Sequence, residues 1–345
     1  MMRASWFTAG LCVAVAAIAT AGTVRAEGVA DFYKGKQIRM VIGLGAGEAY
    51  DVYARLLARH IVRHIPGNPS IIPQNQPGAG SLNAMNSLYN AAPRDGTVIG
   101  TGHRFIAMMP LLNMEGAKFD PLKFTYIGSM NREVGICIAM KDAGFRTVED
   151  MTTRDFVVGT TGAGAELTNF NATLRAMLGL KLKVITGYRT SLDINAAMEK
   201  GELQGRCGVS YGSLKTTRPH WVANKEVDIL IQLGLTKEKE LAEVPLLGDL
   251  VSDARDRQAL ELMLAPSEMG RPFMAPPEIP ADRAAALRAA FDASMADAAF
   301  LEEATKQRLE IAPLTGAEML ALVTRLYQAP PAVVERARAL VHTVE

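Results

Sequence analysis

The sequence is poor in the residues that bind metals or form redox centres. Its 345 residues include five histidines and three cysteines, and one cysteine, Cys12, lies in an apolar N-terminal stretch. His60 and His64 have the i, i+4 spacing of metal ligands, but no acidic third ligand lies near them in the sequence. The H-E-x-x-H pattern of metalloproteases does not occur. We therefore expect no metal site, no cofactor and no enzymatic activity.

The chain also lacks a strong charge bias. Its 37 basic and 36 acidic residues leave a formal net charge of +1, which provides no electrostatic footprint for nucleic acid. Beyond the N-terminus, no apolar run approaches the roughly 20 residues that a membrane-spanning helix needs. A chain of this length that is 49% hydrophobic can bury one large core or two lobes.

The N-terminus is expected to be a cleavable signal peptide. A positively charged start, an apolar run over residues 7–19 and small residues at Val24 and Ala26 match such a peptide at residues 1–26. The bulky residue before Cys12 argues against a lipoprotein. The sequence therefore predicts a soluble protein exported to the periplasm.

Two cysteines, Cys137 and Cys207, remain after this cleavage. An oxidising exported compartment permits a disulfide between them. Both cysteines lie in strand-like runs, where a buried free thiol is the commoner outcome. We expect two reduced cysteines.

Residues 38–65 contain the pattern around which we interpret the rest of the chain. A short β-branched run at residues 38–42 predicts a buried strand, and residues 43–47 (GLGAG) predict a glycine loop. Apolar residues then recur at helical spacing as far as Ile65. This strand, loop and helix would place unpaired backbone N–H groups at the positive end of a helix, which suits a carboxylate or a phosphate.

A simple tight turn and a dinucleotide site are the alternatives for this loop. Residues 43–47 resemble the G-x-G-x-x-G fingerprint, but the third glycine comes one residue early. The next strand-like run, residues 70–74, ends without an acidic residue for a ribose. We set the dinucleotide site aside. The tight turn stays open, because many strand-to-helix turns contain glycine for geometry alone.

The same kind of segment occurs again along the chain. Residues 75–81 (NQPGAGS) form a second glycine-rich loop before a predicted helix at residues 83–92, and residues 97–101 form a third strand. This βαβαβ rhythm predicts a parallel sheet with ligands at the carboxyl ends of its strands. A strand at residues 156–159 then leads into residues 160–166 (TTGAGAE) and a helix. Two such loops in two lobes imply a cleft that holds a ligand from both sides.

Four motifs occur in order along the first third of the chain: residues 35–42 (GKQIRMVI), 75–80 (NQPGAG), 91–97 (AAPRDGT) and 119–123 (FDPLK). With the glycine loop that leads to Asp51, their order and spacing resemble the Bug or TctC proteins. Those proteins are the extracytoplasmic solute receptors of tripartite tricarboxylate transporters. The resemblance runs over nearly the whole mature chain.

This resemblance implies an α/β fold of the periplasmic binding protein class, type II-like. Each of two lobes would have a mixed sheet flanked by helices, with the ligand cleft between the lobes. We expect residues 27–129 in the first lobe, residues 130–228 in the second, and residues 229–345 back in the first lobe with the C-terminal helices. The return is placed at a strand over residues 227–235. Two crossings would let the lobes close about a hinge.

The resemblance also implies that backbone amides of facing loops hold a small carboxylate. The candidate ligand-binding residues are Gly45, Ala46, Gly47, Glu48, Gly80, Ser81, Thr161, Gly162, Ala163, Gly164, Tyr188 and Arg189. Among side chains, Arg189 is the preferred carboxylate partner because it lies in a predicted loop at the end of a strand. Arg104 and Arg206 are the alternatives.

The sequence departs from the family at the first loop. Glu48, Ala49 and Tyr50 precede Asp51, where the family has prolines and a run of glycines before a Thr-Asp pair. A negative Glu48 would repel a carboxylate unless it points away or the ligand also carries an amino or hydroxyl group.

Aromatic ligands are a further possibility for the predicted cleft. The aromatic residues in predicted loops on this side are Tyr50, Phe105, Tyr188 and Tyr211. They could stack on an aryl carboxylate, or they could be partly buried at the edges of the lobes. The ligand is therefore expected to be a di-, tri- or aromatic carboxylate.

Two functions compete on this sequence. The leading hypothesis is a monomeric periplasmic receptor that captures a small organic acid and delivers it to the membrane permease subunits of a tripartite tricarboxylate transporter. The alternative is a periplasmic sensing module of a membrane signalling protein. Both involve a small-molecule ligand, and neither involves nucleic acid.

Overall fold

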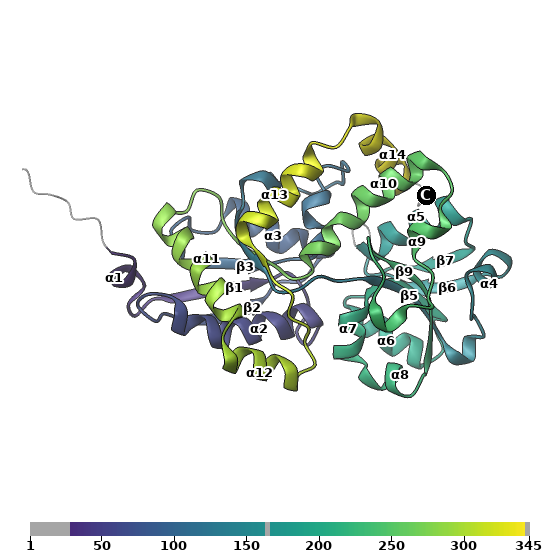
Figure 1. The fold of residues 1–345 in the computed structure, drawn as a ribbon, viewed down its shortest axis with the longest axis horizontal. Coiled ribbons are helices and arrows are strands. Elements are labelled where there is room, and N and C mark those ends of the chain that lie inside the picture. The colour runs from purple at the N-terminus through teal and green to yellow at the C-terminus, as the bar shows by residue number, and fades with distance from the viewer. Residues whose placement is uncertain (1–27, 163–165, 342–345) are drawn as a thin grey trace, which may run out of the picture.

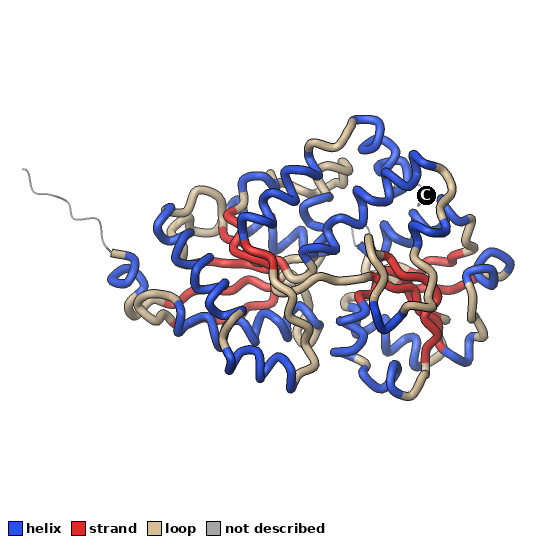
Figure 2. The backbone as a smooth tube through the Cα atoms, in the orientation of Figure 1, coloured by secondary structure: helices blue, strands red, loops and turns tan. Residues whose placement is uncertain are grey.

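The computed structural model describes residues 28–162 and 166–341. The predicted signal peptide, residues 1–26, lies outside these ranges. Figure 1 shows two lobes side by side, and Figure 2 shows their strands in two separate groups. In the described ranges, no helix combines the length and the apolar character that crossing a bilayer requires.

The first lobe is built on a six-stranded mixed sheet with the order β11-β4-β10-β3-β1-β2. Strand β1 runs parallel to β2 and β3, and β10 runs antiparallel to β3 and β4. The strands are β1 (Gln37–Ile42), β2 (Ser70–Asn75), β3 (Val98–Thr101), β4 (Thr125–Ser129), β10 (Pro272–Ala275) and β11 (Leu314–Thr315). The predicted βαβαβ opening of this lobe is confirmed.

Helices cover both faces of this sheet because each has one apolar face to bury. In α2, for example, Tyr53, Leu57 and Ile61 are buried in the same core cluster as Ile38 and Met40 of β1. The helices of this lobe are α1 (Val29–Tyr33), α2 (Ala49–Ile61), α3 (Leu82–Asn90), α11 (Ala281–Met295), α12 (Ala298–Lys306) and α13 (Gly316–Tyr327).

The second lobe is built on a five-stranded mixed sheet with the order β7-β6-β8-β5-β9. Its strands are β5 (Gly135–Met140), β6 (Phe156–Gly159), β7 (Leu182–Ile185), β8 (Gly205–Ser210) and β9 (Val227–Leu233). Its helices are α4 (Val148–Thr153), α5 (Glu166–Leu178), α6 (Ser191–Glu199), α7 (Tyr211–Thr217), α8 (Pro219–Ala223) and α9 (Leu247–Leu250). The predicted fold class, two mixed sheets each flanked by helices, is confirmed.

Two helices connect the cores of the lobes. In α10 (Ala254–Leu264), Met263 packs in the core cluster of the first lobe and Leu260 packs in that of the second. The C-terminal helix α14 (Pro331–Val341) packs against both α5 and α10. Figure 1 shows α10, α13 and α14 running together along one side of the molecule, across the junction of the lobes.

The predicted return of the chain at residues 227–235 is wrong. Strand β9 pairs antiparallel with β5 and is an edge strand of the second sheet. The chain re-enters the first sheet only at β10, after α10 and the 3-10 helix η7 (Ala265–Met269). The β-rich sequence of β9 identified a strand, but such a pattern does not identify the strand's partner.

The expectation of two reduced cysteines is also wrong. Cys137 of β5 and Cys207 of β8 are joined by a disulfide. The antiparallel register of these strands places the two residues directly opposite each other, and both are fully buried. Sequence alone did not provide this register.

We expect Phe291→Ala to lower the free energy of unfolding by about 3–5 kcal/mol, because it removes a buried aromatic side chain and leaves a cavity. Phe291 of α11 is fully buried and contacts β4 at Gly128. Urea denaturation followed by circular dichroism measures the change. As a control, Leu301→Ala on α12 removes a side chain that is 38% exposed and should cost less than about 1 kcal/mol. Equal losses for the two variants would contradict this packing.

Candidate ligand-binding site

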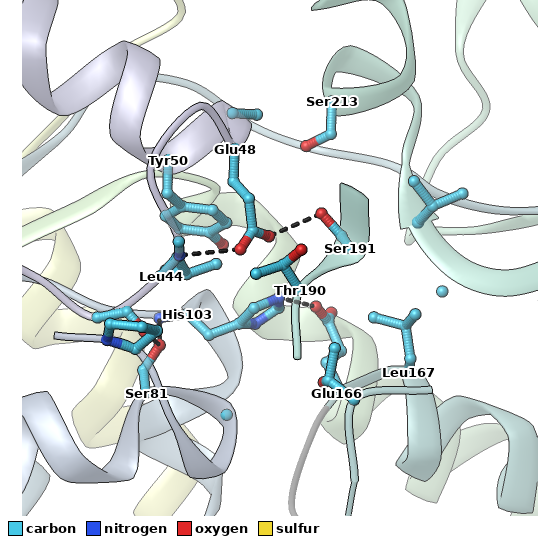
Figure 3. A pocket seen from close by; sticks show the side chains of 18 of the residues that line it. Leu44, Glu48, Tyr50, Ser81, His103, Glu166, Leu167, Thr190, Ser191 and Ser213 are labelled. Atoms are coloured by element: carbon cyan, nitrogen blue, oxygen red, sulfur yellow. Dashed lines mark hydrogen bonds and ion pairs between the residues drawn. The ribbon is translucent and has the colours of Figure 1, made fainter. Parts of the chain in front are cut away.

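A cavity of about 460 Å³ lies between the two lobes. Residues that follow the carboxyl ends of β1, β2 and β3 line it from the first lobe, and residues that follow β6, β7 and β8 line it from the second. Figure 3 shows side chains of both lobes approaching one another in this cavity. Parallel strands of open α/β sheets commonly present their ligand sites at this end.

Many of the predicted site residues meet at this cavity. It is lined by Gly45, Glu48, Gly80, Ser81, Thr161, Tyr188 and Arg189. Ala46, Gly47 and Gly162 do not line it, and Ala163 and Gly164 lie outside the described residues. The backbone N–H of Gly47 is turned to its own helix, where it donates to Asp51 Oδ2 over 2.9 Å.

Helices from both lobes begin at the cavity wall. Ala49 is the first residue of α2, Ser81 directly precedes α3, Glu166 begins α5, and Ser191 begins α6. The N-terminal end of a helix carries a partial positive charge and unpaired N–H groups. Their convergence gives the cavity a field that favours an anionic ligand.

The Glu48 carboxylate points into the space between the lobes. Its Oε1 accepts the backbone N–H of Gly45 over 2.8 Å, and its Oε2 accepts the hydroxyl of Ser191 over 2.7 Å. Figure 3 shows both contacts. Because Gly45 lies in the first lobe and Ser191 in the second, Glu48 joins them. A Cβ at Gly45 would lie 2.7 Å from Glu48 Oε1, so a side chain there would push this carboxylate out of its position.

The buried arginine of the second lobe is Arg206, in β8. Its Nη1 donates to the backbone carbonyl of Ser191 over 3.1 Å and to Asn195 Oδ1 over 2.7 Å, while its Nε has no partner. Burial lowers the pKa of Arg206 to about 10, and the nearby Glu48 carboxylate opposes this shift. The guanidinium is still charged at neutral pH.

The sequence-based preference for Arg189 over Arg206 does not match this burial. Arg189 lines the mouth of the cavity but is exposed, and no hydrogen bond or ion pair links it to another described residue. The available signal for Arg206 was a charged residue inside an otherwise small and apolar strand, residues 205–209. Such a charge is buried at a cost and therefore needs a specific role.

A buried ion pair crosses between the lobes beside the cavity. Arg104, which begins the 3-10 helix η3 (Arg104–Met108) after β3, donates from Nε to Glu166 Oε1 of α5 over 2.8 Å. Burial lowers the pKa of Arg104, but Glu166, Tyr50 and Glu133 together raise it by more, so its net shift is upward. Removing one partner of such a pair would leave an uncompensated buried charge.

His103 lies next to this pair, with Nε2 3.0 Å from Glu166 Oε2. Burial lowers the pKa of His103 to about 4, against the opposing effect of Glu166. The imidazole is therefore neutral at pH 7. The backbone N–H of Phe105 donates to its Nδ1 over 3.5 Å, which places the ring proton on Nε2, toward Glu166.

Arg271 was not predicted from the sequence as a site residue. It directly precedes β10 and lines the cavity. Its Nη2 lies 2.6 Å from Glu133 Oε1 and donates to Ser213 Oγ of α7 over 2.9 Å. Its guanidinium carbon lies 4.2 Å from the centre of the Tyr50 ring. Arg271 and Glu133 are about 140 residues apart in the sequence. Only the packing of the whole chain brings them together at the cavity.

The four aromatic candidates divide into two groups. Tyr50 and Tyr188 line the cavity, whereas Phe105 and Tyr211 are buried in core clusters and do not line it. The Tyr50 hydroxyl accepts the backbone N–H of Arg104 over 3.1 Å, and burial raises its pKa. Tyr50 is thus held as part of the wall.

Two sequence patterns with catalytic associations have structural roles here. Residues 208–212 (GVSYG) match the G-x-S-x-G pattern of nucleophile elbows. The expectation of no enzymatic activity overlooked this match. Ser210 has an extended backbone, with φ −70°, and its Oγ caps α7 by accepting the N–H of Ser213 over 3.0 Å. His60 and His64 contact carboxylates of α12 and its N-cap, Glu303 and Asp297. In the described ranges no group of three potential metal ligands occurs.

The fold and the cavity can be compared with known proteins. The periplasmic binding protein BugD superposes with a TM-score of 0.71 at 19% sequence identity, covering 89% of this chain and 98% of that one. MatC from Rhodopseudomonas palustris with bound malate gives 0.68 at 16% identity, covering 89% and 99%. A TctC solute binding protein from Polaromonas gives 0.61 at 18% identity, covering 90% and 100%.

The fold is that of the Bug and TctC solute-binding proteins. No family model matches the chain. A UPF0065 protein of Bordetella bronchiseptica is 28% identical over 86 residues, which span a quarter of this chain and a quarter of that protein. The sequence resemblance to Bug and TctC proteins thus agrees with the fold, and two of the loops that carry it, residues 43–47 and 75–81, reach the cavity.

We expect His103, which is neutral at pH 7 and has a side chain that is 17% exposed, to make stability depend on pH. Its pKa is about 4 in the folded protein and 6.5 in an unfolded chain, so only the unfolded state takes up the proton between these values. Its contribution is therefore complete above pH 6.5 and falls by up to roughly 1.4 kcal/mol per pH unit as the pH drops toward 4. Thermal unfolding from pH 8 to 4 measures this.

The matched control is His103→Gln, which has no titrating ring. The difference in stability between wild type and His103→Gln should shrink as the pH falls from 6.5 to 4. A difference that stays constant over this range would show that His103 is not buried in its neutral form.

Proposed function

We propose that this protein is a periplasmic solute receptor of the Bug and TctC type that binds a small organic acid between its lobes. The observation that carries this proposal is the buried Arg206 in the cavity wall, which contacts no carboxylate directly among the described residues and is attracted by Glu48 only at longer range. A buried charge without a counterion is costly. A ligand carboxylate would supply the counterion, and an arginine fork suits a carboxylate in geometry.

The electrostatics of the cavity support an acid ligand in a second way. Helices α2, α3, α5 and α6 all begin at its wall, so their dipoles add to the attraction of Arg206 for an anion. Among proteins with the same fold, MatC was solved with malate and the Rhodopseudomonas palustris protein Rpa4515 with adipate. Both compounds are small carboxylic acids.

Contacts between the lobes support a receptor that closes on its ligand. Glu48 reaches Ser191, Arg104 reaches Glu166, and Arg271 reaches Ser213. Each of these contacts borders the cavity. Closure of the two lobes would therefore form the contacts and at the same time remove the ligand from water. Hinge closure of this kind converts ligand binding into a surface that a partner can recognise.

The receptor would act in the periplasm, to which the predicted signal peptide at residues 1–26 would direct it. It would be a monomer and would deliver the acid to the membrane permease subunits of a tripartite tricarboxylate transporter. In this function the protein binds and releases its ligand unchanged, so it needs no catalytic group.

We expect Arg206→Gln to lower the affinity for the organic acid by roughly 10- to 100-fold, because a charge-assisted hydrogen bond contributes about 1.5–3 kcal/mol. Isothermal titration calorimetry against mono-, di- and tricarboxylates, including malate and adipate, identifies the acid and then measures the loss. Arg189→Gln removes the same charge from an exposed position and should cost less than about threefold.

The two arginines distinguish the outcomes. A larger loss for Arg189→Gln than for Arg206→Gln would place the carboxylate at the mouth of the cavity instead of at its wall. Wild-type protein that binds no organic acid of any class would refute the proposed function.

A further inference from the structure

Glu48 is a buried carboxylate with no direct cationic partner among the described residues. The residue is 7% exposed, and its two carboxylate oxygens accept hydrogen bonds from neutral groups only, the Gly45 N–H and the Ser191 hydroxyl. In the described part of the chain its direct contacts include no lysine, arginine or histidine, and Arg206 attracts it only at longer range. Buried carboxylates in proteins are normally paired with a cation or a metal.

Arg206 is the complementary case. It is 2% exposed, and its hydrogen bonds go to the Ser191 carbonyl and the Asn195 amide oxygen, both neutral. The other buried charges in the described ranges have direct partners: Asp51 with Arg55, His60 with Glu303, Arg104 with Glu166, and Glu133 with Arg271. Glu48 and Arg206 therefore differ from the rest, and both line the cavity.

Ser191 lies between these two unpaired charges. Its hydroxyl donates to Glu48 over 2.7 Å, and its backbone carbonyl accepts from Arg206 over 3.1 Å. The carboxylate of Glu48 and the guanidinium of Arg206 thus both contact the same residue of the cavity wall. A carboxylate has lone pairs for about four hydrogen bonds, and Glu48 uses two of them within the protein. Arg206 likewise keeps unused N–H groups.

We propose that the ligand is a zwitterion such as an amino acid, with its ammonium group against Glu48 and its carboxylate against Arg206. This inference rests on the proposed function, because it assumes that an organic acid binds in this cavity. Both charges contact Ser191, so a ligand beside this residue could meet them with an ammonium and a carboxylate on the same or neighbouring carbon atoms. A second carboxylate at Glu48 would be repelled, so a simple dicarboxylate is disfavoured.

The rest of the cavity can hold the ligand's side chain. Leu44 of the first lobe and Leu167 and Val209 of the second line it, and Figure 3 shows Leu44 and Leu167 on opposite sides of the charged centre. Glu48 then acts as the residue that selects ligands with an amino group over those without one. A hydrogen bond between charged groups contributes enough for a preference of about tenfold or more.

The test compares each of the 20 standard amino acids with the matching acid that has hydrogen in place of the amino group. Calorimetry with wild-type protein should find an amino acid that binds at least about tenfold more tightly than its matching acid. Glu48→Gln, which keeps the shape but removes the charge, should reduce this preference to less than about threefold. The same variant should bind the matching acid more tightly, which also shows that it is folded.

Glu302→Gln is the control, since it removes a carboxylate that is exposed on α12 and far from the cavity. It should leave the preference unchanged. If organic acids bind but the amino group gives no advantage, or if Glu48→Gln keeps the full preference, this inference is overturned and the proposed function stands. If neither amino acids nor any other organic acids bind, both are overturned.

Discussion

Charges buried between the two lobes organise this protein. Desolvating a charged side chain costs several kcal/mol unless an opposite charge or several hydrogen bonds compensate it. Arg104 of the first lobe is paired with Glu166 of the second, and Arg271 with Glu133. These pairs border the cavity, whereas Glu48 and Arg206 make direct contacts only with neutral groups. In the function proposed above, a ligand provides the counterions that the direct contacts do not.

The backbone brings these charges together through a repeated local unit. In both lobes a strand ends in a polar, glycine-containing loop and a helix begins directly after it, as in β1 with α2 and in β7 with α6. The two sheets present these ends to the same cavity, so helix dipoles, loop amides and side chains converge there. Helices α10 and α14 meanwhile pack against both lobes and join them along one side.

Much of this arrangement could be predicted from the chain. The strand at residues 38–42 and the loop at residues 43–47 follow from a β-branched run that ends in glycines, which is a local signal. The ordered motifs supported the two-lobed α/β fold, and most of the proposed loop residues do line the cavity. The failures concern distant partners. Strand β9 pairs with β5 instead of returning to the first sheet, and Cys137 meets Cys207 in a disulfide.

The sequence by itself determined the first strand and its glycine loop, because propensity and periodicity act over a few neighbouring residues. The resemblance carried by its ordered motifs indicated the two-lobed class of fold. Only the tertiary structure decided that Arg206 is buried while Arg189 is exposed, and that Glu48 turns toward Ser191 of the other lobe. The Glu48 carboxylate, for example, meets a hydroxyl that lies 143 residues away in the chain. Their positions are fixed when the whole chain packs, and no local pattern encodes them.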